Sequence, residues 1–231
     1  MPNHGNWVDI GEMAGYLAQP ATASAPGIVM VQEIFGVNAA MRAKADDFAE
    51  AGFAVLVPDL FWRLQPRVDL GYAEEERKQG FGYMQRFDFK LGVADCVMAA
   101  EWLAARPECS GAVSFVGFCL GGKLAVLAGA RYPGTRAVAS FYGVKLDESV
   151  DVLRELKTPF QFHVGDRDAH IPSEAVDKVR AALAGKENAH VHLYAGAQHG
   201  FFNRMRAEVY APAAAALAQN RTLEMLRKAA Q

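Results

Sequence analysis

A cysteine flanked by glycines, in the segment GFCLGG at residues 117–122, is the first candidate for chemistry in this sequence. The pattern G-x-S-x-G, on a turn between a strand and a helix, holds a nucleophile, and Cys119 stands here in the serine position. Gly117 and Gly121 leave the room that such a tight turn requires. A helix beginning after the thiol favours the thiolate, and the N–H of Leu120 would face the oxygen of a substrate carbonyl. We therefore expect Cys119 to be a nucleophile, with a packed structural thiol as the alternative.

A nucleophile on such a turn needs an acid and then a histidine farther along the chain. The segment GDRDAHIP supplies Asp166 and Asp168, and the later segment QHGF supplies His199. By its place in the loop Asp168 is predicted to orient the histidine, whereas Asp166 is predicted to cap the turn. The order Cys119, Asp168, His199 completes the expected set. No catalytic role is expected for the remaining histidines, which are His4, His163, His170, His190 and His192.

The segment QEIFG at residues 32–36 follows an apolar run and holds two further candidates. A loop in this place normally supplies the second N–H of an oxyanion hole, and we assign it to Ile34. Glu33 is less expected, because a carboxylate near a thiolate opposes its ionisation. It is either a structural hydrogen-bonding group, or a group that holds the thiol inactive or takes its proton when substrate arrives.

Strand-like and helix-like segments alternate along the chain, which is typical of an α/β protein. Strands are expected at residues 28–31, 54–57, 112–117, 137–142, 160–164 and 189–194, and helices at 39–52, 90–106, 123–130 and 207–228. Residues 61–88 fit either a short surface helix or an active-site loop. The candidate residues follow the ends of predicted strands, at the carboxyl edge where the sites of parallel sheets form. We expect one α/β domain over residues 1–231, with a mostly parallel sheet and helices on both faces.

Charge and cysteine content narrow the functional classes. The net charge of −2 does not indicate a nucleic-acid or anionic membrane partner. No apolar run approaches the ~18 residues of a membrane helix, and the N-terminus shows no secretory signal. Three cysteines without CxxC spacing argue against a disulfide framework or a thiolate zinc site, and Cys96 and Cys109 are predicted to be structural thiols. We expect a cytoplasmic protein without metal or cofactor, and the sequence leaves its oligomeric state open.

The candidate segments together resemble the dienelactone hydrolase family of α/β-hydrolases. The matching pieces are QEIFGVNAAMR, PDLFWR, GFCLGGK, SFYGV, GDRDAHIP and QHGFFN, which run in order from residue 32 to 203. The resemblance implies the α/β-hydrolase fold and catalytic roles for Cys119, Asp168 and His199. It also implies that Glu33 pairs with the cysteine in the resting enzyme.

Catabolic members of this family open the lactone ring of dienelactone to give maleylacetate and hold the substrate carboxylate with two arginines. The resemblance assigns Arg77 to one of these, and Arg204 or Arg206 to the other, although the family's spacing lands on Asn203. A salt bridge between Arg77 and Glu74 on a helix surface is the alternative for Arg77. Phe81 and Met84 stand where Tyr and Trp are expected in the lactone-opening enzymes, so the exact substrate is less defined than the reaction.

The sequence therefore predicts a hydrolase of small anionic lactones or esters with a Cys119–His199–Asp168 triad and an oxyanion hole formed by Leu120 and Ile34. A general carboxylesterase or thioesterase on the same fold is a second hypothesis, with no particular role for the arginines. A non-catalytic relative that senses peroxide through a low-pKa thiol is a third.

Overall fold

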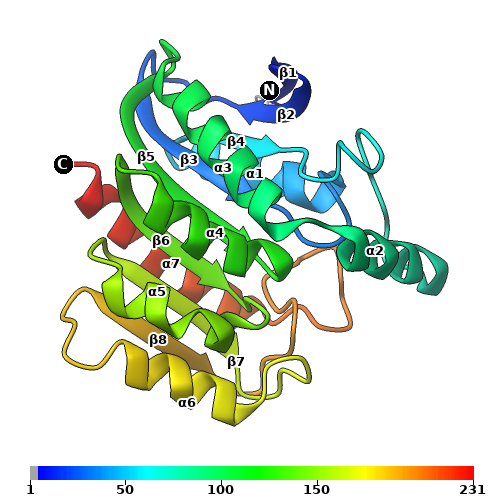
Figure 1. Ribbon diagram of the computed structural model, residues 1–231, viewed down its shortest axis with the longest axis vertical. Coiled ribbons are helices and arrows are strands. Elements are labelled where there is room, and N and C mark those ends of the chain that lie inside the picture. The colour runs from blue at the N-terminus through cyan, green and yellow to red at the C-terminus, as the bar shows by residue number, and fades with distance from the viewer. Residues whose placement is uncertain (1–4) are drawn as a thin grey trace.

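A twisted sheet of eight strands runs through the computed structural model, which describes residues 5–231 (Figure 1). The strands are β1 (Asn6–Ile10), β2 (Met13–Ala18), β3 (Ala25–Val31), β4 (Ala54–Pro58), β5 (Cys109–Phe118), β6 (Thr135–Phe141), β7 (Phe160–Gly165) and β8 (Ala189–Tyr194). Their order across the sheet is β1-β2-β4-β3-β5-β6-β7-β8. The pairs β1–β2 and β2–β4 are antiparallel, and every pair from β4 to β8 is parallel. The prediction of an α/β protein with a mostly parallel sheet is confirmed.

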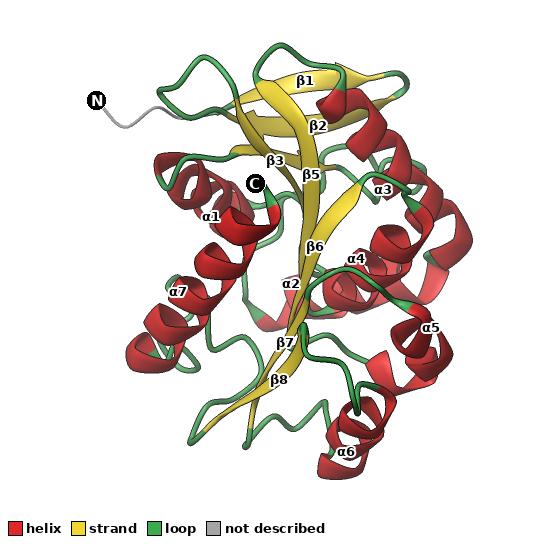
Figure 2. Cartoon of the chain, turned by 90° about the vertical axis from the view of Figure 1, so that its left-hand side faces the viewer, coloured by secondary structure: helices red, strands yellow, loops and turns green. Residues whose placement is uncertain are grey.

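Helices cover both faces of this sheet (Figure 2). On one face lie α1 (Ala39–Glu50) and α7 (Pro212–Ala229), and on the other α3 (Phe89–Ala104), α4 (Leu120–Arg131), α5 (Val150–Glu155) and α6 (Ser173–Ala182). The helix α2 (Glu74–Arg86) lies apart from these layers, beyond the arrowheads of the central strands (Figure 1). Because both faces are covered, the central strands are mostly apolar, as expected for a buried parallel sheet. No helix in the described part of the chain is both long and apolar enough to cross a membrane.

All of the predicted strands are present, with ends that differ by a few residues. The first helix begins as predicted, because the Asn38 side chain accepts a hydrogen bond from the Met41 N–H at 3.1 Å. The segment 61–88, left open between helix and loop, contains α2. The Glu76 carboxylate fixes the start of this helix by accepting the N–H groups of Gly71 at 2.8 Å and Ala73 at 3.1 Å.

The predicted start of the last helix is wrong, since the helix begins at Pro212 and not at residue 207. Residues before it form consecutive turns, in which the Arg206 carbonyl accepts the N–H groups of Val209 at 3.1 Å and Tyr210 at 2.9 Å. Proline is favoured in the first turn of a helix, where its missing N–H is not needed. The sequence pattern also did not predict the hairpin β1–β2 or the helices α5 and α6. β1 is a partly exposed edge strand, so its apolar pattern is weak.

The turn between β5 and α4 is the tightest feature of the sheet's carboxyl edge. Cys119 has φ of 55° and ψ of −117°, a conformation that side-chain-bearing residues rarely adopt. Its N–H donates to the Phe141 carbonyl at 3.0 Å, and its carbonyl accepts the N–H groups of Gly122 at 3.0 Å and Val144 at 3.3 Å. A Cβ at position 117 would lie 1.9 Å from the Gly121 carbonyl oxygen, so only glycine fits there. The predicted strand–turn–helix around Cys119 is therefore present.

We predict that Gly117→Ala destabilises the fold by at least about 2 kcal/mol, because main-chain atoms must move to admit the methyl group. Gly82→Ala in α2 is the control, since a Cβ there meets nothing within 4 Å. That change should instead stabilise by up to about 1 kcal/mol through helix propensity. Urea unfolding followed by circular dichroism measures both, and a Gly117→Ala protein as stable as the wild type would refute this account of the turn.

Candidate active site

A cleft of about 490 Å³ opens at the carboxyl edge of the sheet, above Cys119. Apolar and charged side chains from several elements line it, namely Glu33, Ile34, Phe35, Arg77, Phe81, Met84, Gln85, Phe89, Cys119, Lys123, Val144, Lys145, His170, His199 and Arg206. The elements that supply them are α2, the first residue of α3, the turn and first helical turn at α4, and the loops after β3, β6, β7 and β8. The structure thus brings together most of the residues that the sequence singles out.

Asp168 and His199 follow β7 and β8, and these neighbouring parallel strands bring the two side chains together. The His199 Nδ1 atom lies 2.9 Å from the Asp168 Oδ2 atom. The other carboxylate oxygen of Asp168 accepts the His170 N–H at 2.9 Å, and the Asp168 side chain is completely buried. Because Asp168 occupies Nδ1, His199 presents Nε2 to the thiol of Cys119, with which it forms a hydrogen bond.

The protonation of His199 is set by these two neighbours. Burial lowers the pKa of His199, but the negative charge of Cys119 and the hydrogen bonds to Asp168 and Cys119 outweigh burial and raise this pKa to about 10. A pKa of about 10 favours a protonated imidazole at neutral pH. His199 can therefore serve as a proton donor beside the sulfur of Cys119.

Asp166 is structural, but it joins two loops and does not cap its own turn as predicted. Its Oδ1 atom accepts the Gly196 N–H at 2.7 Å and so ties the loop after β7 to the loop after β8. The two aspartates of GDRDAHIP thus divide their roles, since Asp166 joins the loops and Asp168 contacts His199.

Glu33 is buried at the edge of the cleft, but its hydrogen bond is to Tyr142 and not to the thiol. The Glu33 Oε1 atom accepts the Tyr142 hydroxyl at 3.1 Å, while Oε2 has no hydrogen-bond partner within residues 5–231. Cys119 is hydrogen-bonded to His199. The structure therefore does not show the expected pairing of Glu33 with Cys119, since the hydrogen bond of Glu33 is to the Tyr142 hydroxyl.

A buried lysine accompanies this glutamate and was not singled out in the sequence. The Lys44 amine lies 5.1 Å from the centre of the Phe118 ring and has no hydrogen-bond partner in the described part of the chain. Burial lowers the pKa of Lys44, and the charge of Glu33 opposes this shift. The two charges thus offset part of each other's cost of burial.

The two candidate oxyanion donors come from different elements, α4 and the loop after β3. Leu120 is the first residue of α4, where N–H groups have no acceptor within the helix. Ile34 lines the cleft in the loop after β3, next to Glu33. Both positions agree with what the sequence predicts, and their role in stabilising an oxyanion remains a prediction.

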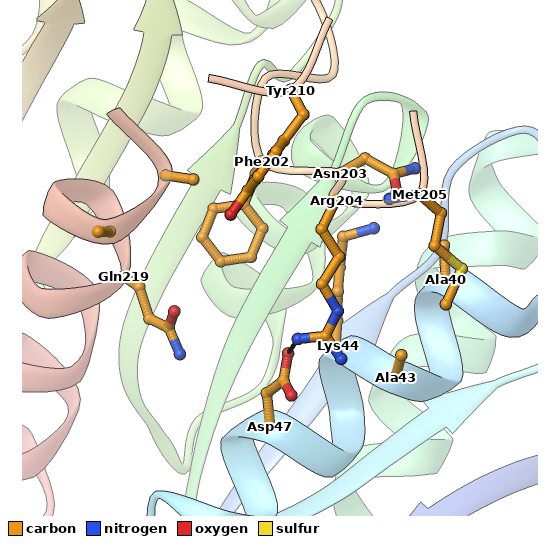
Figure 3. A pocket seen from close by; sticks show the side chains of 12 residues that line it. Ala40, Ala43, Lys44, Asp47, Phe202, Asn203, Arg204, Met205, Tyr210 and Gln219 are labelled. Atoms are coloured by element: carbon orange, nitrogen blue, oxygen red, sulfur yellow. Dashed lines mark hydrogen bonds and ion pairs between the residues drawn. The ribbon is translucent and has the colours of Figure 1, made fainter. Parts of the chain in front are cut away.

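The arginines require a correction. Arg77 and Arg206 line the cleft, whereas Arg204 points away from it into a separate pocket beside α1 (Figure 3). There its guanidinium lies 2.6 Å from the Asp47 carboxylate. Arg206 is more buried than Arg204 and packs its guanidinium 5.3 Å from the centre of the Tyr72 ring. Glu74, the alternative partner of Arg77, pairs with Lys78 at 3.1 Å.

Three residues of the cleft were missed in the sequence. The His170 ring stands edge-on to His199 with centres 4.7 Å apart, and its position two residues after Asp168 in GDRDAHIP is the signal that was available. Lys123 follows Cys119 by four residues and therefore shares its helix face. Lys145 had no signal in the sequence, since only the fold carries the loop after β6 to the cleft.

Within residues 5–231 the other histidines and cysteines are not among the residues that line the cleft. His163 is fully buried and bonded to Tyr194 at 2.8 Å, and burial lowers its pKa well below the usual range. His190 and His192 lie on the edge strand β8, and His4 is outside the described residues. Cys96 and Cys109 are buried, and burial raises the pKa of both thiols. Their prediction as structural thiols is confirmed.

Comparison with known proteins agrees with this site. The family model of the dienelactone hydrolase family matches residues 13–230. The chain belongs to the dienelactone hydrolase family. It is 37% identical over 211 residues to a carboxymethylenebutenolidase of Pseudomonas putida, covering 91% of this chain and 89% of the relative. It is 34% identical to carboxymethylenebutenolidase 1 of Cupriavidus pinatubonensis, covering 94% and 92% of the two chains.

Solved structures of the family share its architecture. A putative dienelactone hydrolase from Klebsiella pneumoniae superimposes with a TM-score of 0.81 at 28% identity, covering 93% of this chain and 92% of that one. The predictions of family, of the α/β-hydrolase fold and of an enzyme that hydrolyses carboxylic esters or lactones are confirmed.

We predict that Cys119→Ala lowers the pKa of His199 markedly from its value of about 10, because the charge and the hydrogen bond of Cys119 are lost. Nitrogen-detected NMR titration of the imidazoles measures this shift. His192, whose pKa burial lowers to about 4, is the control and should not change.

The same shift fixes the sign of the pH dependence of stability. Since the pKa of His199 is raised from 6.5 to about 10, its stabilising effect is complete below about pH 6.5 and is lost as the pH rises through about 10. An unchanged His199 titration in Cys119→Ala would contradict the proposed coupling.

Proposed function

We propose that the chain hydrolyses small anionic lactones or esters of the dienelactone type, with Cys119 as nucleophile. The observation that carries this proposal is the position of His199, which contacts Asp168 on one side and Cys119 on the other at the floor of a cleft. Membership of the dienelactone hydrolase family supports the same reaction class.

In the first half of the reaction the Cys119 sulfur attacks the carbonyl carbon, and the carbonyl oxygen takes up the negative charge. The N–H groups of Leu120 and Ile34 stabilise this oxyanion. When the tetrahedral species collapses, the bond from carbon to the ring oxygen breaks and a thioester forms. The leaving oxygen stays attached to the acyl group of a lactone; as an enolate it needs little acid catalysis, and His199 Nε2 is available as the proton donor.

In the second half a water molecule hydrolyses the thioester. His199 removes a proton from the water, Asp168 holds the imidazole in the required orientation, and the thiolate of Cys119 leaves. The products are the free carboxylate and the regenerated enzyme. With dienelactone as substrate, the ring-opened product is maleylacetate.

Charge and shape of the cleft support an anionic substrate. Arg77 and Arg206 bring two guanidinium groups to it, and guanidinium groups bind carboxylates through paired hydrogen bonds. Apolar side chains such as Phe81, Met84 and Phe89 also line it. These favour a general carboxylesterase as the second candidate function, and neutral p-nitrophenyl esters distinguish it from the lactonase.

The compartment and partners follow from the sequence. Three cysteines without CxxC spacing support a reducing compartment, and we propose the cytoplasm as the site of the reaction. The proposed partner is the small substrate, without a metal or cofactor and without nucleic acid or membrane.

We predict that Cys119→Ala lowers kcat/KM for dienelactone at least about 1,000-fold, and that His199→Ala lowers it to a similar degree, because the two side chains act as one unit. Steady-state kinetics at saturating and limiting lactone measure this. Cys109→Ala is the matched control, since that thiol is buried away from the cleft. Full activity in Cys119→Ala would exclude thiol catalysis and would leave a non-catalytic redox role for the thiol.

We predict further that Arg206→Gln raises KM for dienelactone about tenfold or more, because a charge-assisted hydrogen bond to the carboxylate is lost. Arg204→Gln should leave KM unchanged, because that side chain pairs with Asp47 outside the cleft. KM for a neutral p-nitrophenyl ester provides the comparison. Equal KM effects of the two substitutions would remove Arg206 from substrate binding, and faster turnover of neutral esters than of the lactone would favour the general esterase.

A further inference from the structure

Two separate pairs of cationic side chains reach the cleft, and the proposed reaction needs only one of them. Arg206 pairs with Glu208, and a backbone hydrogen bond, followed by the hydrogen bond and charge of Arg206 and the charge of Arg77, lowers the pKa of that glutamate. A second pair, Lys123 and Lys145, also lines the cleft. These two lysines pair with a different carboxylate, that of Glu148.

Lys123 is held close to the candidate nucleophile. It lies on α4 one turn after Cys119, and its side chain is only 14% exposed. The Lys123 Nζ atom lies 2.7 Å from the Glu148 Oε2 atom and 5.6 Å from the centre of the Phe89 ring. A mostly buried ammonium is unfavourable unless an anion faces it. In the absence of substrate Glu148 supplies that anion, so Lys123 brings a positive charge to the wall of the cleft near the thiol.

Lys145 lines the cleft as well, and it lies in the loop after β6. Its backbone is left-handed, with φ of 55°, which is uncommon for a residue with a side chain. The residue before it, Val144, donates its N–H to the Cys119 carbonyl at 3.3 Å, so the loop is fixed against the turn of the nucleophile. The Lys145 Nζ atom lies 3.7 Å from the Glu148 Oε1 atom. Left-handed backbone of this kind is concentrated at functional sites.

Lys123, Lys145 and Glu148 together carry two positive charges and one negative charge. Two ammonium groups share the single carboxylate of Glu148, and their presence lowers the pKa of Glu148, with the hydrogen bond to Lys123 as the largest cause. The Glu148 side chain is 53% exposed, so it can turn into water at little cost. The two lysines are then free to bind another carboxylate.

We propose that Lys123 and Lys145 form a second anion subsite of the cleft, which binds an additional carboxylate of the substrate in place of Glu148. The substrate class is then a lactone or ester with two carboxylates, one held by Arg77 and Arg206 and the other by the lysines. This assignment rests on the proposed hydrolase for the reacting group, but the binding of the second carboxylate does not depend on catalysis.

Calorimetric titration of the Cys119→Ala protein with glutarate and butyrate tests the subsite without turnover. The two probes have similar chains and differ in one carboxylate, so the ratio of their dissociation constants reports that group. We expect glutarate to bind about tenfold more tightly than butyrate, the effect of one charge-assisted hydrogen bond. Adding Lys123→Met and Lys145→Met should bring the ratio close to one.

Lys78→Met in the same background is the matched control. Lys78 forms a similar surface pair with Glu75 at 2.8 Å but does not line the cleft, so the ratio should not change. Should Lys123→Met fail to fold, Lys145→Met alone serves, because that side chain is 69% exposed and its loss should still reduce the ratio. A ratio that is the same with and without the lysines overturns the proposal.

Glu148→Gln provides a test of opposite sign. Removing the competing carboxylate should tighten glutarate binding about threefold, since the lysines no longer have to release a partner. Weaker glutarate binding in Glu148→Gln would overturn the displacement of Glu148.

A last experiment separates this proposal from the proposed function. In the protein with Cys119 intact, kcat/KM for a dicarboxylate ester relative to a monocarboxylate ester should fall about tenfold in the double lysine variant. Hydrolysis of both esters with an unchanged ratio overturns the subsite alone. Glutarate selectivity without any hydrolysis overturns the hydrolase alone.

Discussion

At Cys119 the chain must leave β5 and enter α4 within a single residue, and it does so with a left-handed backbone. The glycines around this turn are required because the main chain of Gly121 lies against Gly117, and the carbonyls of Val31 and Gln32 lie against Gly121. The close approach joins β5, α4 and the loop after β3 in one rigid unit. That loop carries Glu33 and Ile34, so their distance from the thiol is fixed by the same contact. The geometry of the cleft floor therefore depends on a backbone contact rather than on any side chain.

The second organising feature is the separation of the two buried carboxylates near the thiol. Asp168 is used by His199 and by the His170 N–H, and Glu33 is used by the hydroxyl of Tyr142. Each carboxylate thus has a partner of its own. The thiol of Cys119 is hydrogen-bonded to the imidazole of His199 and not to either carboxylate. Burial lowers the pKa of the nearby Lys44, and the charge of Glu33 opposes this shift.

Local sequence was sufficient to predict the candidate residues that lie on short segments at strand ends. Cys119, Asp168 and His199 were predictable because glycine spacing and strand order are both properties of local sequence, and parallel pairing then brings the strand ends together. The fold class followed from the alternation of apolar runs.

Long-range contacts were not predictable in the same way. The hydrogen bond between Glu33 and Tyr142 depends on side chains far apart in the chain, and so does the burial of Lys44. The sequence could not decide between Arg204 and Arg206 for a related reason. Both follow His199 closely in sequence, and the turns before Pro212 determine which of them lines the cleft.

The loop after β8 carries His199 and Arg206 into the cleft and directs Arg204 to the opposite side. His199 is anchored at one end by Asp168, whereas the residues after it are held by local turns that end at α7. Changes in the length of this segment during evolution would therefore move the arginine without disturbing the histidine. The positions of the arginine and the histidine in the cleft are thus set by separate parts of one loop.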